Sequence, residues 1–442
     1  MATVEFVIPS VLNKGAGEKK LSLDASTLED AFNIISNMLG DDFKRRVIDI
    51  NGKPRALINI YINGKNIRFN NTGMNSILKD GDSVYILPAV AGGAEITSKD
   101  MIRYSRQIML EEIGYVGMEK LKDAKICVVG AGGTGNPVVT QLVGMGVGKI
   151  RLVDRDVVEI SNLHRQHLYG EADVGKVKVE AALERLQKMN SGVDIEAIPI
   201  SVTPFTADDI IKDCNIVIDA LDSIDARYAL NDACLKLGIP FIYAGALGMV
   251  GSVFTILPHE SACLRCIFPE LSEDEMPTCS TEGVHPSILY LVAGIQVSEA
   301  VKIIVGQQPS LVNKLLYIDL NDLVFEKIQM YRHDECSSCG LNVNKKIIQA
   351  PPSLMVEELC GRDRGKRTYT VTPAQIKNDI NLLNVLKNAE SQGYTITSRG
   401  NLGITVSNQN KLLISFLTSG AATIVGAKNE DEALSIYKTF TN

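Results

Sequence analysis

The sequence predicts an α/β protein in which a doubly wound parallel sheet is flanked by two small α+β segments. Three observations predict this class. A glycine-rich turn at residues 130–135 lies between an apolar strand and a helix. The first 93 residues follow the order hairpin, helix and strands, and a last group of strands and helices follows a stretch containing lysines and prolines at residues 342–352. We therefore expect domains at residues 1–93, 99–342 and 350–442, with a linker at residues 94–98.

The first segment has the order of elements of a ubiquitin-like β-grasp domain. Alternating apolar and polar residues predict a strand at residues 3–8, and residues 19–23 can return as the second arm of a hairpin. Apolar residues at helical spacing predict a helix at residues 28–38. Further strands are predicted at residues 57–62 and 83–87.

The central segment contains a βαβ unit. After a mostly helical stretch at residues 100–121, an apolar strand at residues 125–129 leads into the glycine turn, a helix and the strand at residues 149–153. Strand, glycine turn, helix and strand are the repeating unit of a doubly wound, Rossmann-like sheet. Further strands are predicted at residues 195–200 and 215–219, and a helix at residues 287–305.

The last segment is predicted to hold four strands and two helices. Its strands are expected at residues 368–371, 402–406, 411–416 and 421–425. Its last helix has a clear start, because Asn429 can cap the helix and Glu432 follows three residues later. We can assign no chemistry to this segment and expect it to serve in dimer formation or in docking.

Composition narrows the class of protein. With 442 residues the chain is long enough for several domains, and its formal net charge of −7 argues against a nucleic-acid binder that works through bulk electrostatics. The longest uncharged stretch, residues 241–257, contains three glycines and is slightly short for a membrane span, so we expect buried strands there. Nine cysteines without a visible secretion signal indicate a reducing compartment. We expect a cytoplasmic protein.

The glycine turn is a candidate phosphate-binding loop. Its glycines are Gly130, Gly132, Gly133 and Gly135. Backbone N–H groups and the start of the following helix can bind phosphate there. Asp154 ends the next strand, at the position where an acid binds ribose hydroxyls. This pattern fits an NAD-dependent dehydrogenase and an adenylating enzyme equally well, and purely structural glycines are a further alternative.

Polar and cationic residues after Asp154 favour a nucleoside triphosphate. They are Asp156, Asn162, Arg165 and Lys178. Cations suit the charge that develops as pyrophosphate leaves, whereas a dinucleotide does not need so many. The alternative is a solvated surface run.

These motifs carry a resemblance: residues 99–340 resemble the MoeB/ThiF adenylyltransferases, relatives of the ubiquitin-activating enzymes. The matching motifs are Arg103-Tyr-Ser-Arg106-Gln107, the glycine loop, the run from Asp154 to Gln166, Lys178, and Asp219-Ala-Leu-Asp222-Ser223.

The resemblance implies a role for each matching residue. Gly133 would contact the phosphates, Asp154 the ribose, and Asn162, Arg165 and Lys178 the triphosphate of ATP. Asp222 would act with Mg²⁺ at the reacting centre. Arg106 would reach into the ATP site of a partner subunit, which implies a homodimer. Ser223 departs from the pattern, because many members carry asparagine there.

Two pairs of cysteines have the spacing of metal ligands. They are Cys263 with Cys266 and Cys336 with Cys339. Four thiolates suit tetrahedral Zn²⁺ and leave no open position, so the metal would be structural. Redox-active thiols and four unrelated cysteines are the alternatives.

The other cysteines have less defined roles. Cys279 lies in a stretch with proline, glycine and acids, and in relatives a cysteine at this place handles sulfur as an acyl disulfide or thioester. The alternative is a bystander thiol, and the nearby acids would raise its pKa. Cys127, Cys214 and Cys234 are expected in the core, and Cys360 is expected to be structural.

The first segment ends in a diglycine. Residues 1–93 resemble MoaD-like sulfur carriers, most closely the CysO type, in which the terminal glycine is adenylated and converted to a thiocarboxylate. Here Gly92 and Gly93 are followed by Ala94, so the Gly93 carbonyl is part of a peptide bond. Either the diglycine is a hinge between domains, or cleavage behind Gly93, by a metalloprotease that recognises such tails, frees the carrier.

Together these observations predict an adenylyltransferase for a ubiquitin-like sulfur carrier, fused to one such carrier. Its expected ligands are ATP, Mg²⁺ and Zn²⁺, and its partners are the carrier, a second copy of the chain and a sulfur donor such as a sulfurtransferase or sulfide. The thiocarboxylate would serve molybdopterin, cysteine, thiamine or thio-tRNA synthesis. Alternatives are a protein-conjugation activator with a thioester at Cys279, an NAD-dependent oxidoreductase with a zinc domain, and a non-catalytic scaffold.

Overall fold

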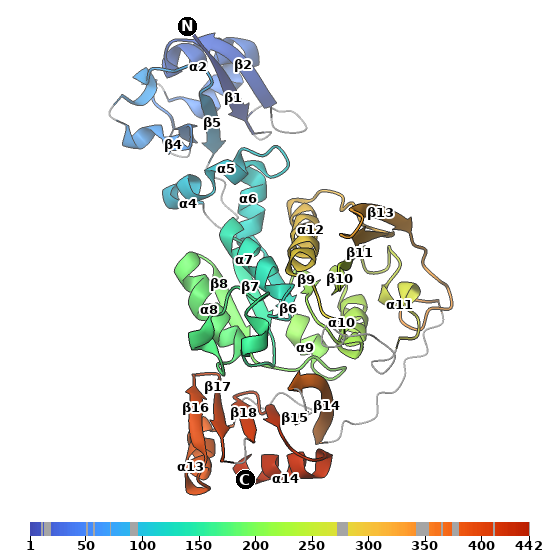
Figure 1. The fold of residues 1–442 in the computed structure, drawn as a ribbon. Coiled ribbons are helices and arrows are strands. Elements are labelled where there is room, and N and C mark those ends of the chain that lie inside the picture. Colours follow the sequence, from blue (N-terminus) through green and yellow to red (C-terminus); the bar gives the residue numbers. More distant parts are fainter. Residues whose placement is uncertain are drawn as a thin grey trace. The chain divides into compact units, whose positions relative to one another are not determined.

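The chain forms two compact units, Met1–Asp123 and Ala124–Asn442, in a computed structural model whose elements Figure 1 labels. The structure describes residues 1–9, 12, 19–49, 52–55, 58–70, 72–88, 96–271, 282–341, 353–363, 366–373, 380–409 and 412–441. The diglycine, Cys279 and the predicted linker at residues 342–352 lie outside the described residues.

The first unit contains the predicted β-grasp sheet. Its strands are β1 (Ala2–Ile8), β2 (Lys19–Ala25), β3 (Ile58–Ile62), β4 (Lys65–Asn66) and β5 (Ser83–Pro88), in the order β2-β1-β5-β3-β4. The neighbouring inner strands β1 and β5 are parallel, and all other pairs are antiparallel. Helix α2 (Leu28–Leu39) buries the predicted apolar stripe against the sheet, and α3 (Asp41–Val47) follows it.

The stretch predicted as mostly helical after this sheet consists of three helices. They are α4 (Ser98–Arg103), α5 (Ser105–Ile108) and α6 (Gly114–Asp123). The break before α6 coincides with Gly114, whose φ of 58° is outside the helical region. Thr97 and Asp100 form a capping box that fixes the start of α4.

The second unit is built on an eight-stranded sheet of order β13-β12-β11-β10-β9-β6-β7-β8. Its strands are β6 (Lys125–Val129), β7 (Lys149–Val153), β8 (Asp194–Ile198), β9 (Ile216–Asp219), β10 (Phe241–Leu247), β11 (Val250–Ile256), β12 (Lys314–Asp319) and β13 (Val324–Gln329). Strands β6 to β10 are parallel, and β11 to β13 extend the sheet in antiparallel fashion. The strand order reverses between β6 and β9, and ligands of such sheets bind at this point.

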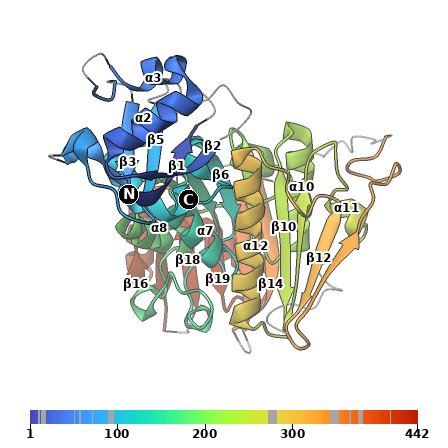
Figure 2. The same cartoon turned by 90° about the horizontal axis from the view of Figure 1, so that it is seen from above.

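Helices cover both faces of this sheet, as expected for a doubly wound fold. One face carries α7 (Gly135–Met145), α8 (Lys178–Met189) and α12 (Pro286–Val305), and the other carries α9 (Ala207–Ile211) and α10 (Ile224–Leu237). Figure 2 shows α12 running along the sheet beside β10. The short α11 (Leu264–Ile267) begins directly after Cys263 and contains Cys266, the first two predicted metal ligands.

Helix α12 is long and apolar enough to span a membrane by composition alone, but it is a core helix. Its buried Gln296 donates to the carbonyls of Asp219 and Ile242. Its buried Glu299 accepts from Thr255 and from the N–H groups of Ser310 and Leu311. These contacts pair the Gln296 amide N–H₂ group and the Glu299 carboxylate inside the protein, while among the described residues Gln296 Oε1 accepts no hydrogen bond.

The last segment is a six-stranded antiparallel sheet of order β14-β15-β19-β18-β17-β16. Its strands are β14 (Leu354–Asp363), β15 (Lys366–Pro373), β16 (Thr395–Arg399), β17 (Gly403–Ser407), β18 (Leu413–Leu417) and β19 (Ala422–Val425). Helices α13 (Leu382–Ser391) and α14 (Glu430–Thr441) bury its apolar face. Asn429 caps α14 as predicted, because its side chain accepts the N–H of Glu432 at 2.9 Å.

Candidate active site

The glycine turn between β6 and α7 has no room for side chains at its ends. Gly130 has a φ of 106°, and a methyl group on it would lie 2.2 Å from the Ala220 carbonyl oxygen. On Gly135 a methyl group would lie 1.9 Å from the Gly130 carbonyl oxygen. The turn therefore closes tightly on itself and on the residue that follows β9.

The middle glycines face the segment that carries Arg165. A methyl group on Gly133 would lie 2.7 Å from Leu289 Cδ1 of α12 and 3.6 Å from Arg165 Cδ. On Gly132 it would lie 3.6 Å from Gln166 Nε2. The structure thus brings the predicted phosphate loop and the predicted cationic segment together.

Asp154 ties the loop to the end of β7. Its carboxylate accepts the N–H of Ala131 and the N–H of Asp156, both at 2.7 Å. Burial raises the pKa of the Asp154 carboxyl, while the charge of Lys178 acts in the opposite direction. A carboxylate held this way presents a fixed acceptor at the end of the strand, as binding of ribose hydroxyls requires.

Lys178 stands at the first position of α8 and pairs with Asp156. Its Nζ lies 2.9 Å from Asp156 Oδ2, and its N–H donates to the Asp156 carbonyl at 2.8 Å. Its side chain is only 7% exposed, so the ammonium group is fixed in place. The structure therefore places Asp156 as the ionic partner of the predicted triphosphate lysine.

Asn162, Arg165 and Gln166 belong to one compact turn after β7. Asn162 is buried and its side-chain oxygen accepts the N–H of Glu159 at 3.2 Å, while Arg165 Nη1 donates to the Ser161 carbonyl at 2.9 Å. Gln166 is buried, and among the described residues its Oε1 accepts no hydrogen bond. A free acceptor beside Gly132 fits a site that binds a polar ligand.

Asp222 lies on the turn after β9, next to the glycine loop. Asp219, fully buried, accepts the N–H of Leu221 and pairs with Arg227 Nε, both at 2.9 Å. Arg227 also donates to the carbonyls of Leu221 and Ala244. This network fixes the turn and leaves Asp222 exposed at its tip.

Ser223, the departure from the family pattern, begins the next helix. Its hydroxyl accepts the N–H of Ala226 at 3.4 Å, so it caps α10. Serine and asparagine are both good N-cap residues. The departure therefore keeps a capping residue next to Asp222.

The described structure does not place the remaining predicted residues relative to this site. Arg106 is exposed on α5, in the first unit. Gly92, Gly93, Cys279 and the side chain of Cys360 lie outside the described residues. The roles predicted for them stay predictions.

Several buried polar residues of the site were not singled out from the sequence. Asn136 donates to the Ala131 carbonyl and accepts the N–H of Leu168, and Tyr169 donates to the same carbonyl at 2.8 Å. Gln296 reaches the carbonyl of Asp219 at 2.7 Å. The sequence offers no specific signal for Gln296, because α12 also contains the polar residues Glu299 and Lys302.

The four predicted metal-ligand cysteines form one cluster. Their sulfur atoms all lie within 4.8 Å of one another. The shortest distances are 3.4 Å between Cys266 and Cys339 and 3.6 Å between Cys263 and Cys336. Zn–S bonds of about 2.3 Å place tetrahedral ligands about 3.8 Å apart, so the spacing fits Zn²⁺.

The electrostatics of this cluster also fit a cation. The neighbouring thiols Cys266 and Cys339, together with burial, raise the pKa of Cys263 far above its usual value. Four thiolates would repel one another unless a cation compensates their charge. The remaining cysteines predicted in the core, Cys127, Cys214 and Cys234, are buried.

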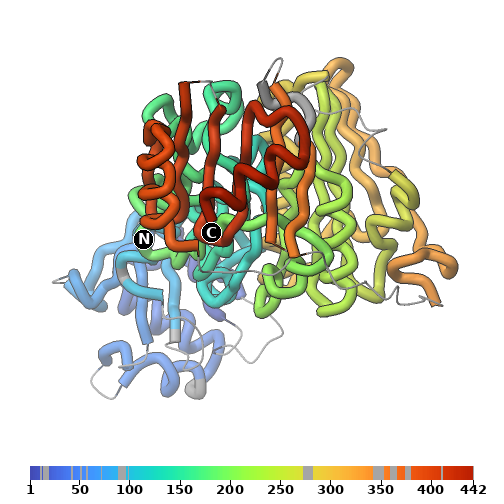
Figure 3. Tube along the Cα trace, turned by 90° about the horizontal axis from the view of Figure 1, so that it is seen from below, coloured from blue at the N-terminus to red at the C-terminus, as the bar shows by residue number. Residues whose placement is uncertain are grey.

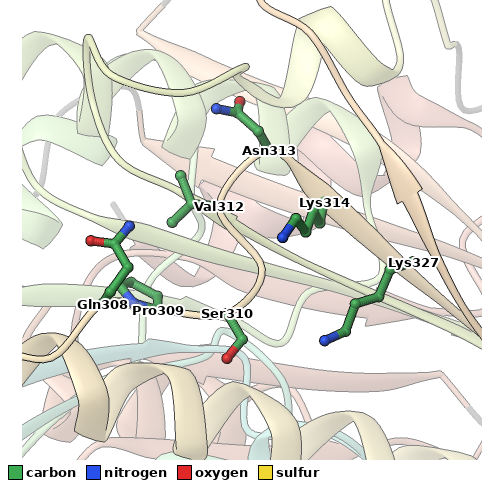
Figure 4. Close-up of a pocket in the computed structure, with 7 residues that line it drawn as sticks. All are labelled: Gln308, Pro309, Ser310, Val312, Asn313, Lys314 and Lys327. Atoms are coloured by element: carbon green, nitrogen blue, oxygen red, sulfur yellow. The ribbon is translucent and has the colours of Figure 1, made fainter.

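Two surface pockets are separate from the glycine loop. One, of about 520 Å³, lies where the segment after α12 meets β12 and β13 (Figure 4), and it is lined by Gln308, Pro309, Ser310, Val312, Asn313, Lys314 and Lys327. The other is lined by His167, Pro286, Ser287, Tyr290 and Leu291. Neither is lined by a residue that the sequence predicts for catalysis or binding.

Comparison with family models gives two matches. Residues 104–338 match the ThiF family, and residues 12–93 match the ThiS family. The second match ends at the position of Gly93.

Curated relatives have related names. The chain is 33% identical over 341 residues to the sulfur carrier protein ThiS adenylyltransferase of Bacillus subtilis, covering 76% of this chain and 98% of the relative. It is 37% identical over 250 residues to the sulfur carrier protein adenylyltransferase of Thermus thermophilus, covering 55% and 92%. It is 36% identical over 239 residues to the SAMP-activating enzyme E1 of Haloferax volcanii, covering 54% and 88%.

Proposed function

Because the chain belongs to the ThiF family, we propose that it uses ATP to adenylate the C-terminal glycine of a ubiquitin-like sulfur carrier. One observation carries this proposal above all. A ThiF match and a ThiS match occur in the same chain, and the ThiS match ends at Gly93. One chain thus contains both a segment of the enzyme family and a segment of the family that would supply its substrate.

The proposed reaction joins a carboxylate to the α-phosphate of ATP. A free Gly93 carboxylate attacks that phosphorus, the bond to the β-phosphate oxygen breaks, and an acyl-adenylate and pyrophosphate result. The N–H groups of the glycine loop, Arg165 and Lys178 stabilise the developing charge, and Arg106 of a second copy adds to them. Asp154 orients the ribose. Asp222 would hold Mg²⁺, which offsets phosphate charge.

One step would precede adenylation and another would follow it. Cleavage between Gly93 and Ala94, by a metalloprotease that recognises ubiquitin-like tails, frees the carboxylate, because an amide carbonyl is not a nucleophile toward phosphorus. Sulfide then displaces AMP and leaves a thiocarboxylate. A persulfide donor would instead displace AMP to form an acyl disulfide, and a thiol would reduce its S–S bond to release the thiocarboxylate and a new disulfide. We place this chemistry in the cytoplasm, where the cysteines stay reduced.

The test is ATP–pyrophosphate exchange by the full chain with a separate carrier fragment. Residues 1–93, ending in a free Gly93 carboxylate, should support exchange. The matched control is residues 1–94, in which the Gly93 carbonyl is an amide and the free carboxylate belongs to Ala94, and it should support none. Replacement of Asp222 by alanine should abolish exchange with the first fragment, because the reacting centre loses its acid.

Two results would contradict the proposal. If a chain that binds ATP gives no exchange with either fragment, the first domain is a docking module of a scaffold. If both fragments support exchange, the site also accepts an Ala94 carboxylate and does not require Gly93 as the terminal residue. Nicotinamide binding in place of ATP binding would favour an oxidoreductase.

Protein conjugation is a second candidate, favoured by the similarity to an enzyme named as a SAMP-activating E1. In that case Cys279 would take the carrier from AMP as a thioester. A carrier adduct that dithiothreitol removes, and that a Cys279→Ala chain does not form, would support this function.

A further inference from the structure

The C-terminal sheet contacts the loops that carry the nucleotide-site residues. Figure 3 shows it, in orange to red, beside the green segment that contains β7, β8 and α8. Helices α13 and α14 cover the apolar face of this sheet, and other residues of the sheet contact both main chain and side chains of the nucleotide-site loops. The Thr405 hydroxyl donates to the Gly175 carbonyl at 2.8 Å, and a methyl group on Gly403 would lie 2.5 Å from Val177 Cγ2.

Glu180 makes the most specific of these contacts. It lies in the first turn of α8, two residues after Lys178, and is only 6% exposed. Its two carboxylate oxygens accept the N–H groups of Asn401 and Leu402, at 2.5 and 3.1 Å. Both belong to the turn between β16 and β17, and a methyl group on Gly400 would lie 2.1 Å from Glu180 Oε2. The turn is shaped to receive this carboxylate.

The segment held in this way also forms the nucleotide site. The main chain of residues 175–178 pairs with that of residues 156–158, since Lys178 N–H donates to Asp156 and Val158 N–H donates to Lys176. Lys178 Nζ then reaches the Asp156 carboxylate. The start of α8 is therefore held on two sides. Lys178 contacts the nucleotide-site loop, and Glu180 contacts the C-terminal sheet.

Further contacts hold the loops after β7 and β8. Arg155, which follows Asp154, pairs with Glu357 of β14 at 2.7 Å. The Ser201 hydroxyl, after β8, lies 3.1 Å from the Thr372 hydroxyl of β15, and Ser419 donates to the Pro199 carbonyl. The C-terminal sheet thus contacts both loops beside Asp154.

We propose that Glu180 is a positioning residue, through which the C-terminal sheet fixes the α8 segment so that Lys178 meets the triphosphate of ATP. This inference rests on the proposed function and extends it to the last domain. A buried carboxylate that accepts two backbone N–H groups leaves little freedom to the first turn of α8, which carries it. Loss of the contact would release Lys178 without removing any group that touches ATP.

The test measures binding of ATP and of adenosine to the full chain by isothermal titration calorimetry. In Glu180→Gln, the amide keeps one acceptor and turns an N–H₂ donor toward a backbone N–H, so one hydrogen bond is lost. We expect the Kd for ATP to rise about tenfold, because hydrogen bonds to charged groups are strong. The Kd for adenosine, which has no phosphates, should change less than about twofold.

Two matched variants complete the test. Glu184→Gln makes the same change on the exposed side of α8, where Glu184 lies 3.7 Å from Lys176, and should leave both Kd values unchanged. If Glu180→Gln fails to fold, Thr405→Val serves as the test in its place. It removes the hydroxyl that contacts Gly175 and should weaken the binding of ATP but not that of adenosine. An unchanged ATP Kd, or equal losses for ATP and adenosine, would overturn the inference. Failure of the unmodified chain to bind ATP would instead contradict the proposed function.

Discussion

Gly135 and Gly144 lie on the same helix, α7, in opposite surroundings. A methyl group on Gly135 would lie 1.9 Å from the Gly130 carbonyl oxygen, whereas one on Gly144 would meet nothing within 4 Å. We expect Gly135→Ala to distort the phosphate loop, destabilise the chain by about 1–3 kcal/mol and abolish ATP binding. Gly144→Ala should bind ATP normally and be more stable by up to about 1 kcal/mol.

Thermal unfolding with and without ATP measures both variants. The interpretation of the loop would be wrong if Gly135→Ala retained the ATP-dependent rise in Tm. Because both changes add one methyl group to the same helix, the difference between them isolates the close approach at the loop.

Asp154 makes ATP affinity depend on pH. Burial raises its pKa above that of the unfolded chain, so its contribution to folding stability is present at low pH and is lost as the pH rises through the folded pKa. If Asp154 binds the ribose as proposed, ATP binding has the opposite sign, since the ribose hydroxyls would donate to the ionised carboxylate. Affinity should fall as the pH drops toward this raised pKa, above about 4, the ordinary value for aspartate.

Calorimetric titrations of ATP from neutral to acidic pH measure this dependence. Asp154→Asn should bind ATP more weakly than the unmodified chain at neutral pH, with a flatter profile, because its amide does not ionise. Parallel profiles for the two proteins would assign the dependence to another group.

At the scale of elements, the four-cysteine cluster joins segments that are far apart in the chain. Cys263 is the N-cap of α11 and Cys266 lies within that helix, whereas Cys336 and Cys339 follow β13. Cys336→Ser should lose the bound zinc and lower the Tm, because a structural site needs all four ligands. Metal analysis and thermal unfolding give the two readouts.

The matched control for this prediction is Cys214→Ser, another buried thiol outside the cluster. It should keep a full complement of zinc. A Cys336→Ser protein that retained zinc and an unchanged Tm would show that the cluster is not a structural metal site.

At the scale of the whole molecule, the predicted homodimer can be tested by complementation. If Arg106 acts in the site of the partner copy, Arg106→Ala and Asp222→Ala chains should each be inactive in ATP–pyrophosphate exchange. When the two are co-expressed, half of the dimers contain one intact site, so about one quarter of the activity should return. No recovery from dimers that contain both chains would mean that Arg106 does not act across the interface.

The fused carrier gives the second prediction for the whole molecule. Co-expression with a protease that acts on ubiquitin-like tails should produce two chains, with masses that correspond to residues 1–93 and 94–442. Replacement of Gly93 by a bulky residue should block this cleavage, because a side chain does not fit a channel shaped for diglycine. Persistence of the full-length mass alone would favour the hinge interpretation of the diglycine.

Local sequence patterns were sufficient to predict the βαβ unit, the cysteine cluster and the start of the last helix. The glycine turn between two apolar strands predicted the βαβ unit, and the structure confirms it, because short-range periodicity and glycine placement fix such units. Cysteine spacing predicted the ligand cluster, and the sulfur atoms do come together. The N-cap at Asn429 was equally local and is confirmed.

Only the tertiary structure decided which groups meet across long distances in the sequence. Nothing near Glu180 indicates that its carboxylate binds the N–H groups of residues 401 and 402, more than 200 positions later. The sequence likewise does not indicate the Asp219–Arg227 ion pair or the hydrogen bonds of Gln296, because both arise when packing buries these side chains. Periodicity and spacing describe neighbours along the chain, whereas burial and hydrogen-bond partners depend on how the sheets pack. The contacts between the C-terminal sheet and the α8 segment are therefore seen only in the tertiary structure.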